Sequence, residues 1–152
     1  MHTLRVLCRV ITYDPTTNSI LLVRNRDQKW WCAPGGGWDH AQETILECAK
    51  REVFEETSVQ VNIEKLLYVQ TLHIKNQDSI WLEQFWLAEP AGSAEVPQEH
   101  IDQHGVVDEA RWFNKEEVQA ITVYPEVLKN AFWDAVGDVL RGKDRYLGHF
   151  VL

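Results

Sequence analysis

Hydrophobic residues follow two different spacings along this 152-residue chain, and each spacing predicts one type of element. Short apolar or alternating segments rich in β-branched and aromatic residues predict strands. They cover residues 3–13, 20–26, 30–33, 61–75, 79–88 and 111–113. Segments with helical spacing predict helices near residues 44–57, 115–121 and 125–141. Strands interrupted by helices are typical of an α/β fold, in which helices cover a mixed β-sheet.

Turn residues separate these elements. The segment Asp14-Pro15-Thr16-Thr17-Asn18-Ser19 joins the first two strands and predicts a hairpin. Residues 89–107 hold two prolines, two glycines and several acids, and they predict a long loop of the kind that is usually functional. Because the chain shows no repeat and no low-complexity linker, residues 1–152 are expected to form a single domain.

The helix predicted at residues 44–57 is amphipathic and strongly acidic. Ile45, Ala49 and Val53 form its apolar stripe, with Leu46 beside them. Three glutamates off that stripe, Glu52, Glu55 and Glu56, stand at i, i+3 and i+4, so their carboxylates share one patch. At roughly 6 Å, each pair repels by about 0.7 kcal/mol in water and about 3 kcal/mol at an effective dielectric of 20.

A hard divalent cation would remove this repulsion, because magnesium and manganese prefer carboxylate oxygens. A glutamate-rich helix face is ordinarily just solvated, but here a glycine turn precedes it. The turn Pro34-Gly35-Gly36-Gly37 can bring backbone amides and carbonyls close to a ligand. Arg51 lies four residues from both Glu47 and Glu55, so its planar fork can brace the carboxylates.

In these residues the chain resembles the Nudix, or MutT-like, hydrolases. Their signature is Gly-x5-Glu-x7-Arg-Glu-U-x-Glu-Glu-x-Gly-U, where U is a bulky aliphatic residue, and the segment from Gly37 to Val59 matches eight of its nine specified positions. Trp31-x2-Pro34-Gly35-Gly36 before this segment also resembles family features. So do Ala110-Arg111-Trp112-Phe113 and the following Glu116-Glu117.

This resemblance implies the Nudix α/β/α sandwich and a metal-dependent pyrophosphohydrolase. The implied reaction converts NDP-X and water into NMP and P-X. The implied ligands of Mg²⁺ or Mn²⁺ are Glu52, Glu55 and Glu56, with the Gly36 carbonyl as a further candidate. Glu43 and Arg51 would orient these groups.

In many relatives a carboxylate outside the signature, in the loop before the last strand, is the general base or a further metal ligand. The resemblance therefore implies Glu99 or Glu95 as the base in this chain. Glu83 and Glu109 are less favoured candidates. A general base must reach the attacking water within hydrogen-bonding distance, which a sequence does not show.

Two departures from the family pattern motivate an alternative. Ser58 replaces the last glycine of the signature, and Gln42 stands where relatives often have a glycine. A non-catalytic Nudix-fold module that senses nucleotides or binds a protein would tolerate both changes. An isomerase of allylic diphosphates is a second alternative, although no catalytic cysteine motif is evident.

The substrate class follows from the resemblance, and the aromatic residues add candidate contacts. We expect a small molecule, either a nucleoside triphosphate or a nucleoside diphosphate derivative. Among seven tryptophans, Trp30, Trp38 and Trp86 are candidate stacking surfaces for a base, and Trp81 is a further one.

The overall composition limits the partners and the location. A net charge of −8 argues against general nucleic-acid binding, which needs a basic surface. No apolar segment is long enough to span a membrane, and Arg5 and Arg9 interrupt the apolar start, where a signal peptide needs an unbroken one. Three cysteines cannot all pair and form no zinc motif, so a reducing cytoplasm is expected.

Two further features of the sequence allow more than one interpretation. His100 and His104 have a zinc-like spacing, but without a third ligand a solvated pair in the loop is favoured. An exposed strand, or the C-terminal segment from Arg145 to Leu152, offers a surface through which two copies can pair as a homodimer.

Overall fold

The computed structural model describes residues 2–99, 102, 104–136 and 146–152. Within them the strands are β1 (Thr3–Asp14), β2 (Ser19–Asn25), β3 (Trp31–Cys32), β4 (Gly35–Gly37), β5 (Val61–Ile74), β6 (Ser79–Pro90), β7 (Val107–Asn114), β8 (Val123–Tyr124) and β9 (Tyr146–Val151). The helices are α1 (Ile45–Thr57), α2 (Lys115–Gln119) and α3 (Ala131–Val136), with short 3₁₀ turns η1 (Lys75–Gln77) and η2 (Glu126–Leu128). This is a mixed α/β fold, as predicted, with a curled mixed sheet.

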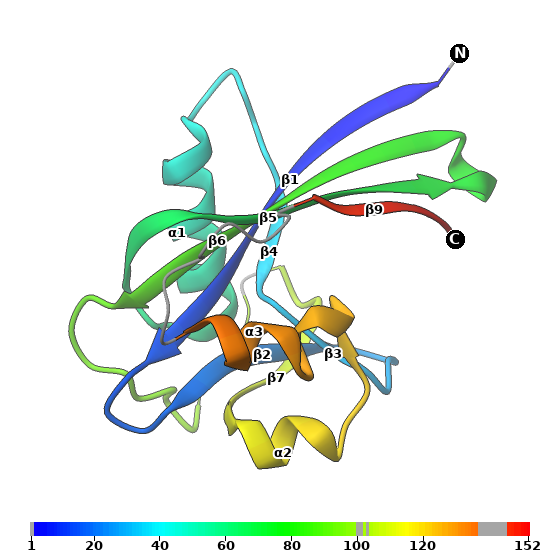
Figure 1. The fold of residues 1–152 in the computed structure, drawn as a ribbon. Helices are drawn as coiled ribbons and strands as arrows, with labels where there is room; N and C mark the ends of the chain where they lie inside the picture. Colours follow the sequence, from blue (N-terminus) through cyan, green and yellow to red (C-terminus); the bar gives the residue numbers. More distant parts are fainter. Residues whose placement is uncertain (1, 100–101, 103, 137–145) are drawn as a thin grey trace.

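The strands form one sheet in the order β8-β3-β2-β1-β6-β5-β9, while β4 pairs with β1 and β7 pairs with β2. The predicted hairpin is confirmed, because Tyr13 pairs with Ile20 across β1 and β2. Strand β1 runs parallel to β6, whereas β5 and β6 are antiparallel. In Figure 1 these long strands extend toward the side where both chain ends lie.

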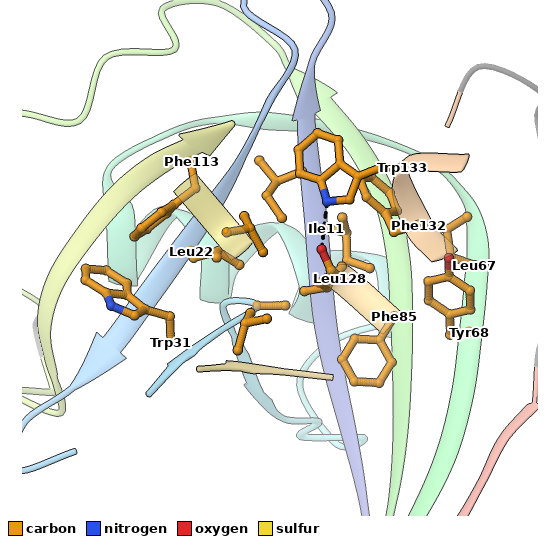
Figure 2. Packing of buried hydrophobic residues seen from close by; sticks show 14 residues of the cluster. Ile11, Leu22, Trp31, Leu67, Tyr68, Phe85, Phe113, Leu128, Phe132 and Trp133 are labelled. Atoms are coloured by element: carbon orange, nitrogen blue, oxygen red, sulfur yellow. Dashed lines mark hydrogen bonds between the residues drawn. The ribbon is translucent and has the colours of Figure 1, made fainter. Parts of the chain in front are cut away.

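Helices cover both faces of the sheet because neighbouring residues of β1 and β2 point in opposite directions. Val10 and Leu21 pack with α1 residues in one buried cluster. Ile11, Leu22 and Phe132 belong to the other cluster, with α2 and α3. Figure 2 shows this second cluster, where the Trp133 indole donates a hydrogen bond to the Leu128 carbonyl at 2.7 Å. The sheet is therefore sandwiched between α1 and the α2–α3 pair, as Figure 1 shows.

Three sequence-based expectations about the elements were wrong. The helix predicted at residues 125–141 is replaced, up to residue 136, by η2 and the short α3, and residues 137–145 lie outside the described part. The glycine turn is the short strand β4, because its backbone pairs with β1. Leu46, placed on the apolar stripe of α1, is 44% exposed, and Cys48 takes that buried place.

The C-terminal segment, considered as a dimer surface, pairs within its own chain, and the homodimer stays a prediction. Strand β9 lies parallel to β5, with Thr71 opposite His149. This pairing occupies one edge of β5. No helix in the described residues is long and apolar enough to cross a membrane.

Helix α1 ends at a serine held in a glycine-like conformation. Ser58 has φ of 62° and ψ of 12°, and its N–H donates to the Phe54 carbonyl at 2.8 Å. A left-handed conformation costs an L-residue about 1–2 kcal/mol, and glycine's extra chain entropy offsets part of that difference. We expect Ser58→Gly to increase the free energy of unfolding by about 0.5–1 kcal/mol, which raises Tm by roughly 2 °C.

Thermal unfolding followed by circular dichroism checks this expectation, with Ser58→Ala as the control. Alanine keeps a Cβ in the left-handed conformation and should not raise Tm. An equal Tm for the glycine variant and the wild type would show that the serine is not strained.

Candidate active site

Helix α1 begins with a capping box that sets the register of its acidic face. The Thr44 hydroxyl accepts from the Glu47 N–H at 3.2 Å, and the Glu47 carboxylate accepts from the Thr44 N–H at 3.0 Å. This reciprocal pair satisfies two backbone donors at the helix start. Glu52, Glu55 and Glu56 occur in the second half of the helix, beyond this fixed end.

Strand β4 lies directly against these glutamates. The Gly35 N–H donates to Glu56 Oε2 at 3.2 Å. A Cβ placed on Gly36 would lie 2.7 Å from the Glu52 carboxyl group, closer than real Cβ atoms come to other atoms. The absence of a side chain at Gly36 therefore lets the backbone of β4 approach the carboxylates of α1.

Arg51 holds three of the carboxylates together. Its Nε and Nη2 donate to the two oxygens of Glu43 at 2.8 and 2.7 Å. Its Nη1 donates to Glu52 Oε1 at 3.0 Å and to Glu55 Oε2 at 3.1 Å. The predicted contact with Glu55 is confirmed, whereas Glu47 caps the helix instead. A bidentate contact fixes the guanidinium plane, so Glu43 anchors Arg51 and Arg51 orients the other two.

Burial changes the protonation of the carboxylates on this face. The pKa of Glu56 is raised to about 8, chiefly by burial and also by the neighbouring Glu52, while Arg9 opposes the rise. Burial also raises the pKa of Glu52, although Arg51 partly offsets it. In contrast, hydrogen bonds from Arg51 lower the pKa of Glu43. Glu52 and Glu56 therefore occupy a region where additional positive charge would stabilise their ionised forms.

These residues suit a hard divalent cation. Carboxylate oxygens are the preferred ligands of Mg²⁺ and Mn²⁺, and the glycine at position 36 leaves its backbone next to Glu52. In the described residues no group of three or more His, Cys, Asp or Glu side chains is already arranged to hold a metal ion. Glu52 and Glu55 accept hydrogen bonds from Arg51, and Glu56 accepts one from the Gly35 N–H.

A second polar network links side chains of three neighbouring strands, β1, β6 and β5, next to β4. Glu83 on β6 is only 3% exposed and accepts from Arg9 of β1 and from the Gln70 amide, the latter at 3.0 Å. The Arg9 guanidinium also donates to the Ala33 carbonyl at 3.4 Å. Glu83, a less favoured candidate for the general base, is therefore a buried ion-pair partner of Arg9.

The loop carboxylates considered as the general base have different surroundings. Glu95 and Glu99 are exposed, and Glu109 contacts Arg24 at 3.1 Å. In the described part of the loop, the side chain that reaches the α1 carboxylates is His104, whose Nε2 lies 3.2 Å from Glu55 Oε2. His100, the other member of the proposed pair, lies outside the described residues.

The candidate stacking tryptophans occupy three different places. Trp30 is 39% exposed and packs edge-to-face on Tyr124, with ring centroids 6.2 Å apart. Trp38 donates its indole N–H to the Glu43 carbonyl at 2.9 Å, so it lies beside the acidic site. Trp86 donates to Gln84 at 3.1 Å. Each of the three indoles therefore contacts a different residue.

The sequence did not predict the contact of His104 with Glu55 or the ion pair of Arg9 with Glu83, although each had a local signal. Asp102 and Gly105 flank His104, and an aspartate followed by glycine is typical of a tight turn that presents its central residues. Arg9 interrupts the apolar strand segment Leu7–Ile11, and a charge inside such a segment signals a buried ion pair.

Comparison with known proteins decides the family. The model of the NUDIX domain matches residues 2–132. The chain belongs to the NUDIX domain family. Membership indicates a Nudix hydrolase acting on pyrophosphate bonds, and such hydrolases generally use divalent metal ions.

Solved structures agree with the Nudix fold. A NUDIX hydrolase from Nitrosomonas europaea has a TM-score of 0.68 at 18% identity, over 97% of this chain and 78% of that one. A UDP-X diphosphatase has a TM-score of 0.69 at 17% identity, over 95% and 66%. The MutT protein from Bacillus halodurans has a TM-score of 0.65 at 23% identity, over 97% and 90%. The search of curated proteins found no match.

Proposed function

We propose that this Nudix hydrolase is a magnesium-dependent pyrophosphohydrolase of nucleoside triphosphates or nucleoside diphosphate derivatives. Water attacks one phosphorus of the diphosphate linkage, so that NDP-X and water give NMP and P-X. The observation that carries this proposal is the contact between β4 and α1. There, a glycine backbone, an amide N–H and two partly buried carboxylates meet within one small region.

Some residues of this region would bind the ion, and others orient these ligands. Glu52, Glu55 and Glu56 would hold the cation, with the Gly36 carbonyl as a further ligand. Arg51 keeps Glu52 and Glu55 in place, and Glu43 keeps Arg51 in place. When bound, the ion neutralises phosphate oxygens and lowers the pKa of water.

The protein's own charges favour an anionic substrate only near this site. The chain carries a net charge of −8, so the surface as a whole repels polyphosphates. Arg9, beside Glu56, and Arg51 are the cations that the structure places near the carboxylates. The exposed Trp30–Tyr124 pair offers apolar ring surface for a base, and the name of the UDP-X diphosphatase is compatible with an NDP-X substrate.

We expect hydrolysis to require a divalent ion. A panel of nucleoside triphosphates, sugar nucleotides and dinucleotides, with Mg²⁺ or Mn²⁺, should show release of NMP with phosphate, pyrophosphate or P-X. Excess chelator should lower the rate at least about 100-fold, because loss of charge neutralisation removes several kcal/mol of transition-state stabilisation. Product analysis by ion-exchange chromatography identifies the bond that breaks.

Readdition of Mg²⁺ to the chelated enzyme is the control and should restore the rate. Turnover that persists in excess chelator would contradict the proposal. Nucleotide binding without turnover of any compound would instead support the non-catalytic module. The end of α1 does not favour that module, because Ser58 adopts the left-handed conformation that ends the helix.

A further inference from the structure

We propose that His104 is a positioning residue for Glu55, which it holds by a hydrogen bond across the active site. The His104 Nε2 atom lies 3.2 Å from Glu55 Oε2. Because an ionised carboxylate only accepts hydrogen bonds, the tautomer that makes this contact carries its hydrogen on Nε2. This inference rests on the proposed function, since it gives His104 a role in a metal site.

The turn that carries His104 is fixed by a buried carboxylate. Asp102 is 5% exposed, and its side chain accepts from three backbone N–H groups. The donors are His104 at 3.2 Å, Val106 at 3.0 Å and Val107 at 2.9 Å. Three N–H groups converging on one carboxylate leave the turn little freedom. The direction in which His104 leaves the backbone is therefore set by Asp102.

Contacts with the segment after β2 fix the same turn from its other side. The Arg26 N–H donates to the Val106 carbonyl at 2.8 Å, and Arg26 Nε donates to the Gly105 carbonyl at 3.2 Å. The Gly105 N–H closes the turn on the Asp102 carbonyl at 2.9 Å. A loop residue with only a solvated role would not need this number of anchoring bonds.

His104 adds a donor that Arg51 alone does not supply. Arg51 Nη1 is shared between Glu52 and Glu55, whereas His104 contacts only Glu55. Both donors bind Oε2 of Glu55, so in the described residues Oε1 is the oxygen left to face an ion. Donors behind a ligating carboxylate fix its orientation, and losing one typically weakens metal binding about 10–100-fold.

Mn²⁺ binding to the full chain, measured by isothermal titration calorimetry, tests this role without turnover. We expect His104→Ala to weaken Mn²⁺ binding about 5–10-fold, near the low end of that range because the imidazole is 64% exposed. His104→Gln places an amide N–H near the position of Nε2 and should stay within about 2-fold of wild type. His149→Ala is the matched control, because His149 is exposed and contacts Thr71 on β5 rather than a residue of α1.

Steady-state kinetics give a second measurement. His104→Ala should lower kcat at a fixed, subsaturating Mn²⁺ concentration and regain most of it at saturating Mn²⁺, with little change in KM for the nucleotide. Equal Mn²⁺ affinity in His104→Ala and wild type, or no recovery in His104→Gln, would overturn the inference. A wild type that binds no Mn²⁺ would instead overturn the proposed function, so the two failures are distinguishable.

Discussion

We expect Glu56→Gln to lower kcat about 10³-fold while leaving the fold intact. Glutamine has the shape of glutamate and can keep the contact with the Gly35 N–H, which lies 3.2 Å from Oε2. It cannot offer the negative charge that a hard cation needs. A 10³-fold loss corresponds to about 4 kcal/mol of transition-state stabilisation, within the several kcal/mol that an ion supplies.

Stability should move little in this variant, because burial already raises the pKa of Glu56 to about 8 and a neutral amide suits the same surroundings. Release of NMP gives kcat, and thermal unfolding gives stability. Glu64→Gln on β5 is the control, since Glu64 is exposed and should retain full activity. A Glu56→Gln enzyme with more than about a tenth of wild-type kcat would remove Glu56 from the ion's ligands.

The sequence predicted the acidic helix well because the information is local. The capping box at Thr44, the acids at positions 52, 55 and 56, and the end at Ser58 all lie within fifteen residues of one another. Helical geometry then places the carboxylates on one face without reference to the rest of the chain. The hairpin between β1 and β2 was predictable for the same reason.

The parts that could not be predicted depend on distant residues. Arg9 and Glu83 are 74 positions apart, and His104 and Glu55 are 49 apart, so no local pattern pairs them. Strand β4 exists because three glycines pair with β1, whereas isolated glycines favour turns. Tertiary context overrides local propensity at each of these places.

The C-terminal part of the chain shows a further limit of periodicity. The helical spacing near residues 125–141 suggested one long helix, yet the structure has η2 and then α3, with Trp133 and Phe132 packed on the sheet. Apolar spacing alone does not distinguish one helix from two short ones that both face the core.

The adjacent glycines Gly35 and Gly36 should separate stability from catalysis. A Cβ on Gly35 would lie 2.2 Å from the Cys8 carbonyl oxygen and 2.6 Å from the Arg9 Cα, both backbone atoms of β1. Strand β4 would have to move, so we expect Gly35→Ala to lower the free energy of unfolding by about 3 kcal/mol. That loss corresponds to a fall in Tm of roughly 6–12 °C, measured by thermal unfolding.

Gly36→Ala meets a movable side chain instead. Its Cβ would lie 2.7 Å from the end of Glu52, which can rotate away at a cost below about 1 kcal/mol. Displacing that carboxylate should lower kcat about 100-fold, because a ligand of the ion is misplaced. Gly92→Ala is the control, since nothing lies within 4 Å of its added Cβ, and it should change neither quantity. Full activity in Gly36→Ala would show that the approach of β4 to Glu52 has no part in the chemistry.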